Sequence, residues 1–336
     1  RLGRAPASND GSGFRTSWED DLTQLASLGI SELMVTLDWA RLWPTPAEPL
    51  EQEIDYRREL LQRTADLGLV PWACLVDGSL PGWFTDDERG FTDDKARGLI
   101  WPRHVDWIGE TFGDLVGGWV PFREPRQWAA WGHLVGATPP GRQRRRDMQK
   151  MVRALDQAEV DAARLLQGSS PIATFVTSRT VAGEPDNVKA APHAQWLDHH
   201  LSSLWLHQLT EGPGREQFDR VIAQLRPPIA VDGEGTWHAL TGGDGADAML
   251  DGLDAVIGGT GDREVVAAGD LAGQPLDGIA GFEHLAEMIA GARERGATGW
   301  WQTSPIDGWH WQHGFERHPG LFDRDRNQRP ATGALT

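Results

Sequence analysis

The 336-residue sequence contains one cysteine, Cys74, and one tyrosine, Tyr56. A single cysteine excludes an intramolecular disulfide and a thiolate metal cluster, which favours a reducing, cytoplasmic setting. No apolar run approaches the ~20 residues of a membrane-spanning helix, and no apolar leader-like segment follows Arg1. Basic residues are scarce: 32 Lys and Arg stand against 49 Asp and Glu, a net charge of −17. The composition therefore argues against membrane insertion and against nucleic-acid binding, which needs a basic surface.

Several cofactor and metal motifs are also missing. No G-x-G-x-x-G follows a strand-like run, and no H-E-x-x-H occurs. The histidines that do cluster, such as His199 and His200, lie in an apolar helical pattern that favours packing over metal binding. We therefore expect neither a cofactor nor a metal ion. No linker or shift in composition divides the chain, so residues 1–336 are predicted to form one domain, and nothing in the sequence specifies an oligomeric state.

What the sequence does contain is a recurring unit: an amphipathic helix, a glycine and a short β-rich run. Helical patterns end at Gly29, Gly68, Gly168 and Gly296, and each is followed by a strand-like segment. Glycine is suited to these positions because it adopts the left-handed conformation that lets the chain turn back after a helix. Strands that alternate with helices, without hairpin dipeptides, indicate parallel strands joined by crossovers.

This alternation predicts an α/β fold of the TIM-type (β/α)8 barrel class. The candidate strands lie near 31–37, 70–76, 119–122, 171–177, 229–231, 264–268 and 298–303. An eighth strand belongs before residue 14, where residues 7–13 are loop-like, so the first strand is degenerate or missing in this chain. The competing fold, an open doubly wound sheet, lacks its glycine-rich motif here.

Four segments, in order and at compatible spacing, resemble the family 1 glycoside hydrolases, the β-glucosidase family. They are Trp39-Ala-Arg-Leu-Trp-Pro44, Leu75-Val-Asp-Gly-Ser-Leu-Pro-Gly-Trp83, Trp119-Val-Pro-Phe-Arg-Glu-Pro125 with the glycine-rich stretch to Gly141, and Asp307-Gly-Trp-His-Trp-Gln-His-Gly-Phe315. The third segment is similar to the family's Trp-x-Thr-x-Asn-Glu-Pro motif. The resemblance spans residues 18–330 and implies a glycoside or sugar-like substrate.

The resemblance places Glu124 at the position of the family's general acid/base. Glycoside hydrolysis uses two carboxyl groups, one to protonate the leaving oxygen and one to attack the anomeric carbon or to activate water. An alternative interpretation rests on local structure alone. A glutamate at the first turn of a helix beginning at Pro125 is favoured by the helix dipole.

The second carboxylate departs from the family pattern. The motif that should end the seventh strand corresponds to Val265-Val-Ala-Ala-Gly-Asp270, which puts Ala268 at the nucleophile position. Alanine cannot form a glycosyl ester. We expect Asp270 or Glu234 to act as the second catalytic group by activating water, an arrangement that inverts the anomeric centre. Asp77, Asp232 and Asp307 are further acids at predicted strand ends.

The same resemblance suggests a set of substrate-binding residues. They are Trp39, Arg41, Asp77, Arg123, Asp232, Trp309, His310 and Trp311. Arg123 stands where the family has asparagine, and two interpretations remain. It binds an anionic group of the substrate, or it forms a structural ion pair with Glu124 or Asp77.

The leading hypothesis is thus a glycosidase-like enzyme that acts on a glycoside or an anionic sugar-like ligand. An alternative is a catalytically inactive barrel that binds a sugar or a protein, because the nucleophile position is altered. A second alternative is a lyase or isomerase that uses Glu124 for proton transfer.

Overall fold

The computed structural model describes residues 11–87, 89–168, 170–239, 246–269, 279–307 and 320–334. The chain forms two compact units. We call Leu22–Phe175 with Gln208–Val221 the N-terminal unit, and Arg1–Asp21 with Val176–His207 and Ile222–Thr336 the C-terminal unit. Among the described residues, no helix has both the length and the apolar character that a membrane span requires.

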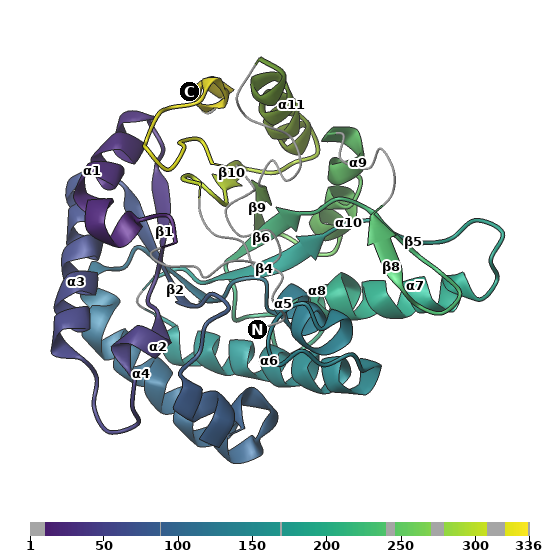
Figure 1. Cartoon of the computed structure of the whole chain (residues 1–336), viewed down its shortest axis with the longest axis horizontal. Helices are drawn as coiled ribbons and strands as arrows, with labels where there is room; N and C mark the ends of the chain where they lie inside the picture. Colours follow the sequence, from purple (N-terminus) through teal and green to yellow (C-terminus); the bar gives the residue numbers. More distant parts are fainter. Residues whose placement is uncertain are drawn as a thin grey trace. The chain divides into compact units, whose positions relative to one another are not determined.

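The N-terminal unit is built on a three-stranded parallel sheet. Its strands are β1 (Glu32–Thr36), β2 (Val70–Val76) and β3 (Gly118–Phe122), in the order β1-β2-β3. Helix α3 (Glu51–Asp66) leads into β2, and α4 (Trp101–Phe112) leads into β3 (Figure 1). Each pair of neighbouring parallel strands is therefore connected by a helical crossover, as the alternation in the sequence predicts.

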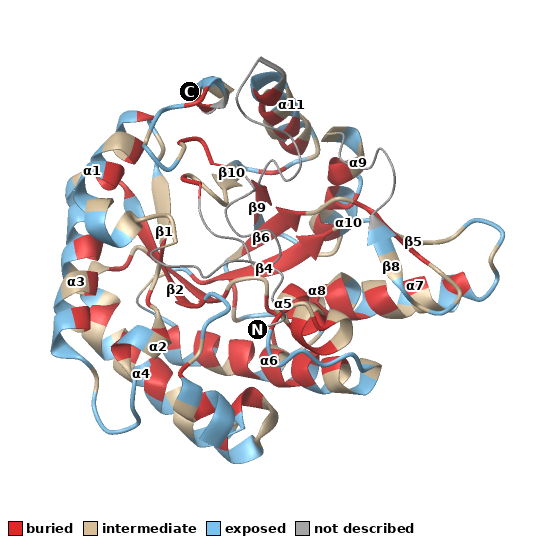
Figure 2. Ribbon diagram, viewed as in Figure 1, coloured by how far each residue is buried: buried red, intermediate tan, exposed pale blue. Residues whose placement is uncertain are grey.

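A four-stranded sheet has the order β10-β9-β6-β4. Its strands are β4 (Ala173–Ser178), β6 (Arg220–Leu225), β9 (Glu264–Gly269) and β10 (Gly299–Gln302), and β9 and β10 run parallel. Strands β4, β6 and β9 are buried along nearly their whole length (Figure 2). Near-continuous burial is typical of parallel strands that are covered on both faces.

Apart from three short strands described below, the remaining elements are helices and short helical turns. The helices are α1 (Phe14–Ser27), α2 (Trp39–Leu42), α5 (Pro125–Ala130), α6 (Arg145–Leu166), α7 (Ala190–Asp198), α8 (Leu204–Thr210), α9 (Ala246–Leu250), α10 (Leu253–Gly258) and α11 (Ile279–Glu294). Helical turns cover Trp83–Asp87, Gly90–Thr92, Ala96–Ile100, Gly113–Leu115, Trp131–Val135, His199–Ser203 and Pro330–Ala334.

The predicted helix-glycine-strand units are confirmed. Helices α1, α3, α6 and α11 end within two residues of the predicted glycines. All four glycines have a positive φ, from 74° at Gly29 to 105° at Gly296. In α6, most apolar side chains spaced by three and four, among them Met148, Val152 and Leu155, are buried, whereas Leu165 is exposed.

The predicted strand at residues 229–231 is confirmed, but it lies outside the four-stranded sheet. Residues 229–231 form β7 (Ile229–Val231), which belongs to a separate three-stranded sheet with β5 (Val181–Gly183) and β8 (Trp237–Ala239). Strand β7 pairs antiparallel with β8, so the chain does contain a hairpin. The strand of the four-stranded sheet is β6 instead. Arg220 and Gln224 interrupt its apolar pattern, and this concealed it in the sequence. The predicted position of a first strand before residue 14 falls largely on residues 1–10, outside the described residues.

An aromatic cluster fills much of the core of the N-terminal unit. Trp39 lies at its centre, is 1% exposed and contacts Phe84, Trp101 and His104. The Trp39 and His104 rings stack at 4.1 Å. Both ring nitrogens of His104 are buried, and neither has a hydrogen-bond partner within the described part of the chain. Burial lowers the pKa of His104 to about 3, so the imidazole is neutral at physiological pH.

Candidate active site

Glu124 lies in the short connection between β3 and α5. Its backbone has φ 45° and ψ 51°, the left-handed region, and Pro125 begins the helix directly after it. The Glu124 side chain makes no capping hydrogen bond to α5, whereas its carbonyl accepts one from the Trp128 amide at 3.0 Å. The left-handed conformation costs a non-glycine residue about 1–2 kcal/mol. Such strain persists only where the surrounding structure enforces it, and it often marks functional sites.

Arg123, the preceding residue, forms an ion pair with Asp77, which directly follows β2. The Arg123 Nη1 atom lies 3.2 Å from the Asp77 Oδ2 atom. The carboxylates of Asp77 and then of Glu124 raise the pKa of Arg123, so the guanidinium stays charged. The structural ion pair that was one interpretation of Arg123 is therefore present. The Arg123 Nε atom is buried and has no hydrogen-bond partner among the described residues.

A buried ionic cluster, which the sequence analysis missed, anchors the first turn of α5. The guanidinium of Arg126 donates to Asp156 at 2.9 Å and to Glu159 at 2.7 Å, both on α6. It also donates to the Phe175 carbonyl of β4 at 3.2 Å. The other carboxylate oxygen of Glu159 accepts a hydrogen bond from Thr174. We call Arg126, Asp156, Glu159 and Thr174 the α5 anchor.

The α5 anchor is almost fully removed from water. Arg126 is 2% exposed and Glu159 is 0% exposed. Burial raises the pKa of Glu159 to about 7, although Arg126 and Thr174 act in the opposite direction. A sequence signal for this cluster is the pair of acids Asp156 and Glu159, three residues apart, because Glu159 falls among the apolar residues of the helical pattern.

Trp39 and Arg41, both predicted to bind substrate, lie on α2 just after β1 but in different surroundings. Trp39 belongs to the aromatic cluster of the core. The Arg41 side chain is 54% exposed and lies 3.4 Å from Asp38. Asp38 caps α2 by accepting a hydrogen bond from the Ala40 amide at 3.1 Å. The structure thus separates the two residues into a core position and a surface position.

In the C-terminal unit, Asp232 and Glu234 lie in the turn that joins β7 to β8. The carboxylate of Asp232 accepts hydrogen bonds from the amides of Glu234 and Thr236, each at 2.8 Å. These bonds, Thr236 first, lower the pKa of Asp232, which keeps it ionised. Both acids thus follow a strand, as predicted, but that strand is β7 of the separate three-stranded sheet, and their polar turn closes a local hairpin.

Ala268, at the expected nucleophile position, is fully buried on β9. Its carbonyl accepts a hydrogen bond from the Gln224 amide at 3.3 Å. Gln224 lies on the neighbouring strand β6, and its Oε1 atom is buried and has no hydrogen-bond partner in the ranges that the structure describes. Sequence reasoning missed Gln224, although a lone polar residue inside Val-Ile-Ala-Gln-Leu was a usable signal. Asp270, Trp309, His310 and Trp311 lie outside the described residues.

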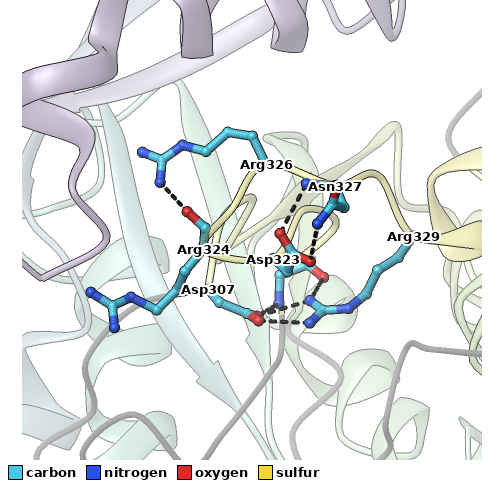
Figure 3. Close-up of polar contacts among 7 residues, drawn as sticks. Asp307, Asp323, Arg324, Arg326, Asn327 and Arg329 are labelled. Atoms are coloured by element: carbon cyan, nitrogen blue, oxygen red, sulfur yellow. Dashed lines mark hydrogen bonds and ion pairs between the residues drawn. The ribbon is translucent and has the colours of Figure 1, made fainter.

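Asp307, another of the candidate acids, is buried in a polar cluster near the C-terminus (Figure 3). Arg329 binds both of its carboxylate oxygens, at 2.9 and 2.7 Å. The Gly320 amide donates to the same carboxylate at 2.8 Å. Asp307 and Gly320 flank residues 308–319, which carry three predicted substrate-binding residues, so this cluster joins the two ends of that segment. Within the described ranges, no three His, Cys, Asp or Glu side chains are grouped as a metal site.

Comparison with known proteins points to one family. The family profile of "Glycosyl hydrolase family 1" matches residues 6–198. Beta-glucosidase 26 of Oryza sativa subsp. japonica is 28% identical over 135 residues, which are 37% of this chain and 24% of that protein. The cytosolic beta-glucosidase of Homo sapiens is 28% identical over 131 residues, or 38% and 28% of the two chains. The matched segment thus spans about a quarter of these relatives' length.

Solved structures match over nearly the whole chain. The AHE enzyme of Alicyclobacillus herbarius has a TM-score of 0.85 at 16% identity, covering 99% of this chain and 89% of that one. A family 1 β-glucosidase of Thermotoga maritima has a TM-score of 0.83 at 16% identity, covering 99% and 88%. At these identities the likeness concerns the fold, an α/β fold that matches the (β/α)8-barrel enzymes of that family.

Proposed function

Because this chain belongs to glycosyl hydrolase family 1, we propose that it cleaves a glycosidic bond with Glu124 as the general acid/base. The observation that carries the proposal is the strained left-handed turn at Glu124, directly after a buried strand and inside the matched segment. Carboxyl groups at the carboxyl ends of barrel strands are where chemistry occurs in this fold class. A glycoside as ligand follows from the family itself.

In the proposed reaction, Glu124 protonates the oxygen of the leaving group as the bond to the anomeric carbon breaks. We propose that Ala268 removes the usual nucleophile, so that water attacks in its place. A second carboxylate, Asp270 or Glu234, takes the proton of that water. This pairing is the inverting arrangement, in which the two carboxyl groups stand about 6.5–9.5 Å apart to leave room for water.

The second candidate function is a sugar-binding protein without catalysis. The observation that favours it is the lack of charge next to Ala268: the polar side chain that reaches this position from β6 is the uncharged carboxamide of Gln224. An amide can bind a hydroxyl group, but it cannot accept a proton from water at neutral pH.

Hydrolysis of a panel of aryl glycosides separates the two functions. We expect the wild-type protein to release the phenol, and Glu124→Gln to lose about 10²- to 10⁴-fold in kcat/KM on poor leaving groups. The second base is identified by whichever of Asp270→Asn and Glu234→Gln abolishes turnover. The anomer first formed, read by NMR, reports inversion or retention.

The controls distinguish catalysis from binding. Arg164→Met changes an exposed residue of α6 that belongs to no candidate site and serves as a surface substitution. If the wild type and Glu124→Gln show equal, negligible turnover while both bind a glycoside by calorimetry, the hydrolase proposal fails and the binding protein remains. Acceleration of the wild type by azide, with a glycosyl azide as the product, would instead show that the nucleophile is missing and that no carboxylate base replaces it.

A further inference from the structure

We infer that Arg126 is a positioning residue that holds the left-handed turn at Glu124 and thereby aims its carboxyl group. This inference rests on the proposed role of Glu124, which lies two residues earlier in the chain. Arg126 is held through its guanidinium by Asp156, Glu159 and the Phe175 carbonyl, which lie on α6 and β4. It acts on Glu124 through the backbone of Pro125 and not by contact with a substrate.

The segment from Phe122 to Arg126 is held at both ends, by the sheet at Phe122 and by the α5 anchor at Arg126. Phe122, the last residue of β3, is held in the sheet through its pairing with Val76. Four residues later, Arg126 ties α5 to α6 and to β4. Because only Arg123, Glu124 and Pro125 span the gap, and proline has a fixed φ, the strain falls on Glu124. This is the over-determination that a left-handed glutamate requires.

Stability alone does not account for the α5 anchor. Removing two carboxylates and a guanidinium from water costs several kcal/mol per ion, and apolar replacements of such clusters are often neutral or stabilising. An apolar residue at position 126 would bury the first turn of α5 equally well. A guanidinium adds direction, because its planar donors accept only one orientation relative to Asp156 and Glu159.

The test is the dependence of the rate on the leaving group. A dinitrophenyl glycoside leaves without protonation, whereas a phenyl glycoside needs a well-placed acid. We expect Arg126→Met combined with Glu159→Leu to lower kcat/KM by about tenfold or more on the phenyl glycoside, the range for an acid displaced by about 1 Å. The loss on the dinitrophenyl glycoside should stay within about threefold. Glu124→Gln should show a still larger difference between the two glycosides. Arg126→Lys, which keeps a positive charge, should lose less activity on the phenyl glycoside than the double variant does.

A matched control comes from the same unit. Arg220 and Glu32 form a half-buried ion pair at 2.7 Å, at the amino ends of β6 and β1. Arg220→Met combined with Glu32→Leu removes a comparable pair far in sequence from the turn. This variant should lower kcat/KM on the two glycosides by the same factor, as a loss of folded protein would.

A second readout does not depend on activity. The Trp128 amide donates to the Glu124 carbonyl, so its hydrogen exchange reports the turn directly. It should exchange at least about tenfold faster in the Arg126/Glu159 variant, with α6 unchanged. If Glu124→Gln shifts the leaving-group ratio and the double variant does not, the positioning role is overturned and the acid/base role stands. If neither shifts the ratio, the acid/base role is wrong, and unchanged exchange at Trp128 then overturns the positioning role as well.

Discussion

At the scale of single residues, burial decides which side chains are available for chemistry. Trp39 and Arg41 are two positions apart, yet the first is in the core and the second at the surface. Glu124 is set apart by its backbone: in the described part of the chain it is one of four non-glycine residues with a positive φ. The sequence identified Glu124 correctly as a position after a strand, but no local pattern revealed the strained turn.

His104 makes stability depend on pH. Its pKa of about 3 in the folded state lies below the ordinary value of 6.5, so the unfolded chain binds the proton more readily. Stability is therefore present above pH ~6.5 and is lost as the pH falls towards 3, by about 1.4 kcal/mol per pH unit. Between pH 6.5 and 4.5, the free energy of unfolding should fall by about 2 to 3 kcal/mol less in His104→Phe than in the wild type.

Urea unfolding at the two pH values measures this difference. His238→Phe, which replaces an exposed histidine, is the control for the substitution itself. Equal slopes for the wild type and His104→Phe would show that His104 is hydrated and titrates normally. Glu159 has the opposite effect on stability, because its raised pKa makes the free energy of unfolding fall as the pH rises from 4.5 to 7. This effect is the same in the wild type and in His104→Phe.

At the scale of elements, side chains that resemble catalytic groups also build turns. Asp232 follows a strand, as a barrel carboxylate would, but its carboxylate binds two amides of the β7–β8 turn. A carboxylate that caps a turn and a carboxylate that acts as a base respond differently to substitution by asparagine. Asparagine keeps an acceptor for the amides. It cannot act as a base.

We expect Asp232→Asn to keep slow hydrogen exchange at the Thr236 amide and Asp232→Ala to lose it, because only the former retains the acceptor oxygen. Amide exchange measured by NMR checks this. Glu234→Ala is the control, since it is the backbone amide of Glu234 that binds Asp232. A large loss of turnover in Asp232→Asn, with the turn intact, would instead give Asp232 a catalytic role.

At the scale of the whole molecule, ion pairs with residues far apart in the sequence hold residues 320–334 in place. Arg326 binds Asp21 through two bonds of 2.8 Å, across 305 residues, and Arg329 binds buried Asp307. Both pairs lie within the C-terminal unit. The prediction that residues 1–336 form one domain stays a prediction.

Arg329→Met should lower the free energy of unfolding by about 3–5 kcal/mol, because it leaves the Asp307 carboxylate buried without its cation. Thermal and urea unfolding provide the measurement. Arg58→Met is the matched control: Arg58 pairs with Asp114 at the surface, where a pair contributes only about 0–1 kcal/mol. A comparable small effect for both variants would mean that water reaches Asp307.

The sequence by itself determined the features that depend on neighbouring residues. The spacing of apolar side chains and the glycines after them specified α1, α3, α6 and α11, and ordered motifs located Glu124 and the family. Tertiary structure alone decided which strands pair and which charges are buried together. It placed β6 rather than β7 in the four-stranded sheet, and it brought Arg126 to Glu159 across 33 residues. The physical reason is that periodicity is encoded locally, whereas a buried ion finds its partner only after the chain has folded.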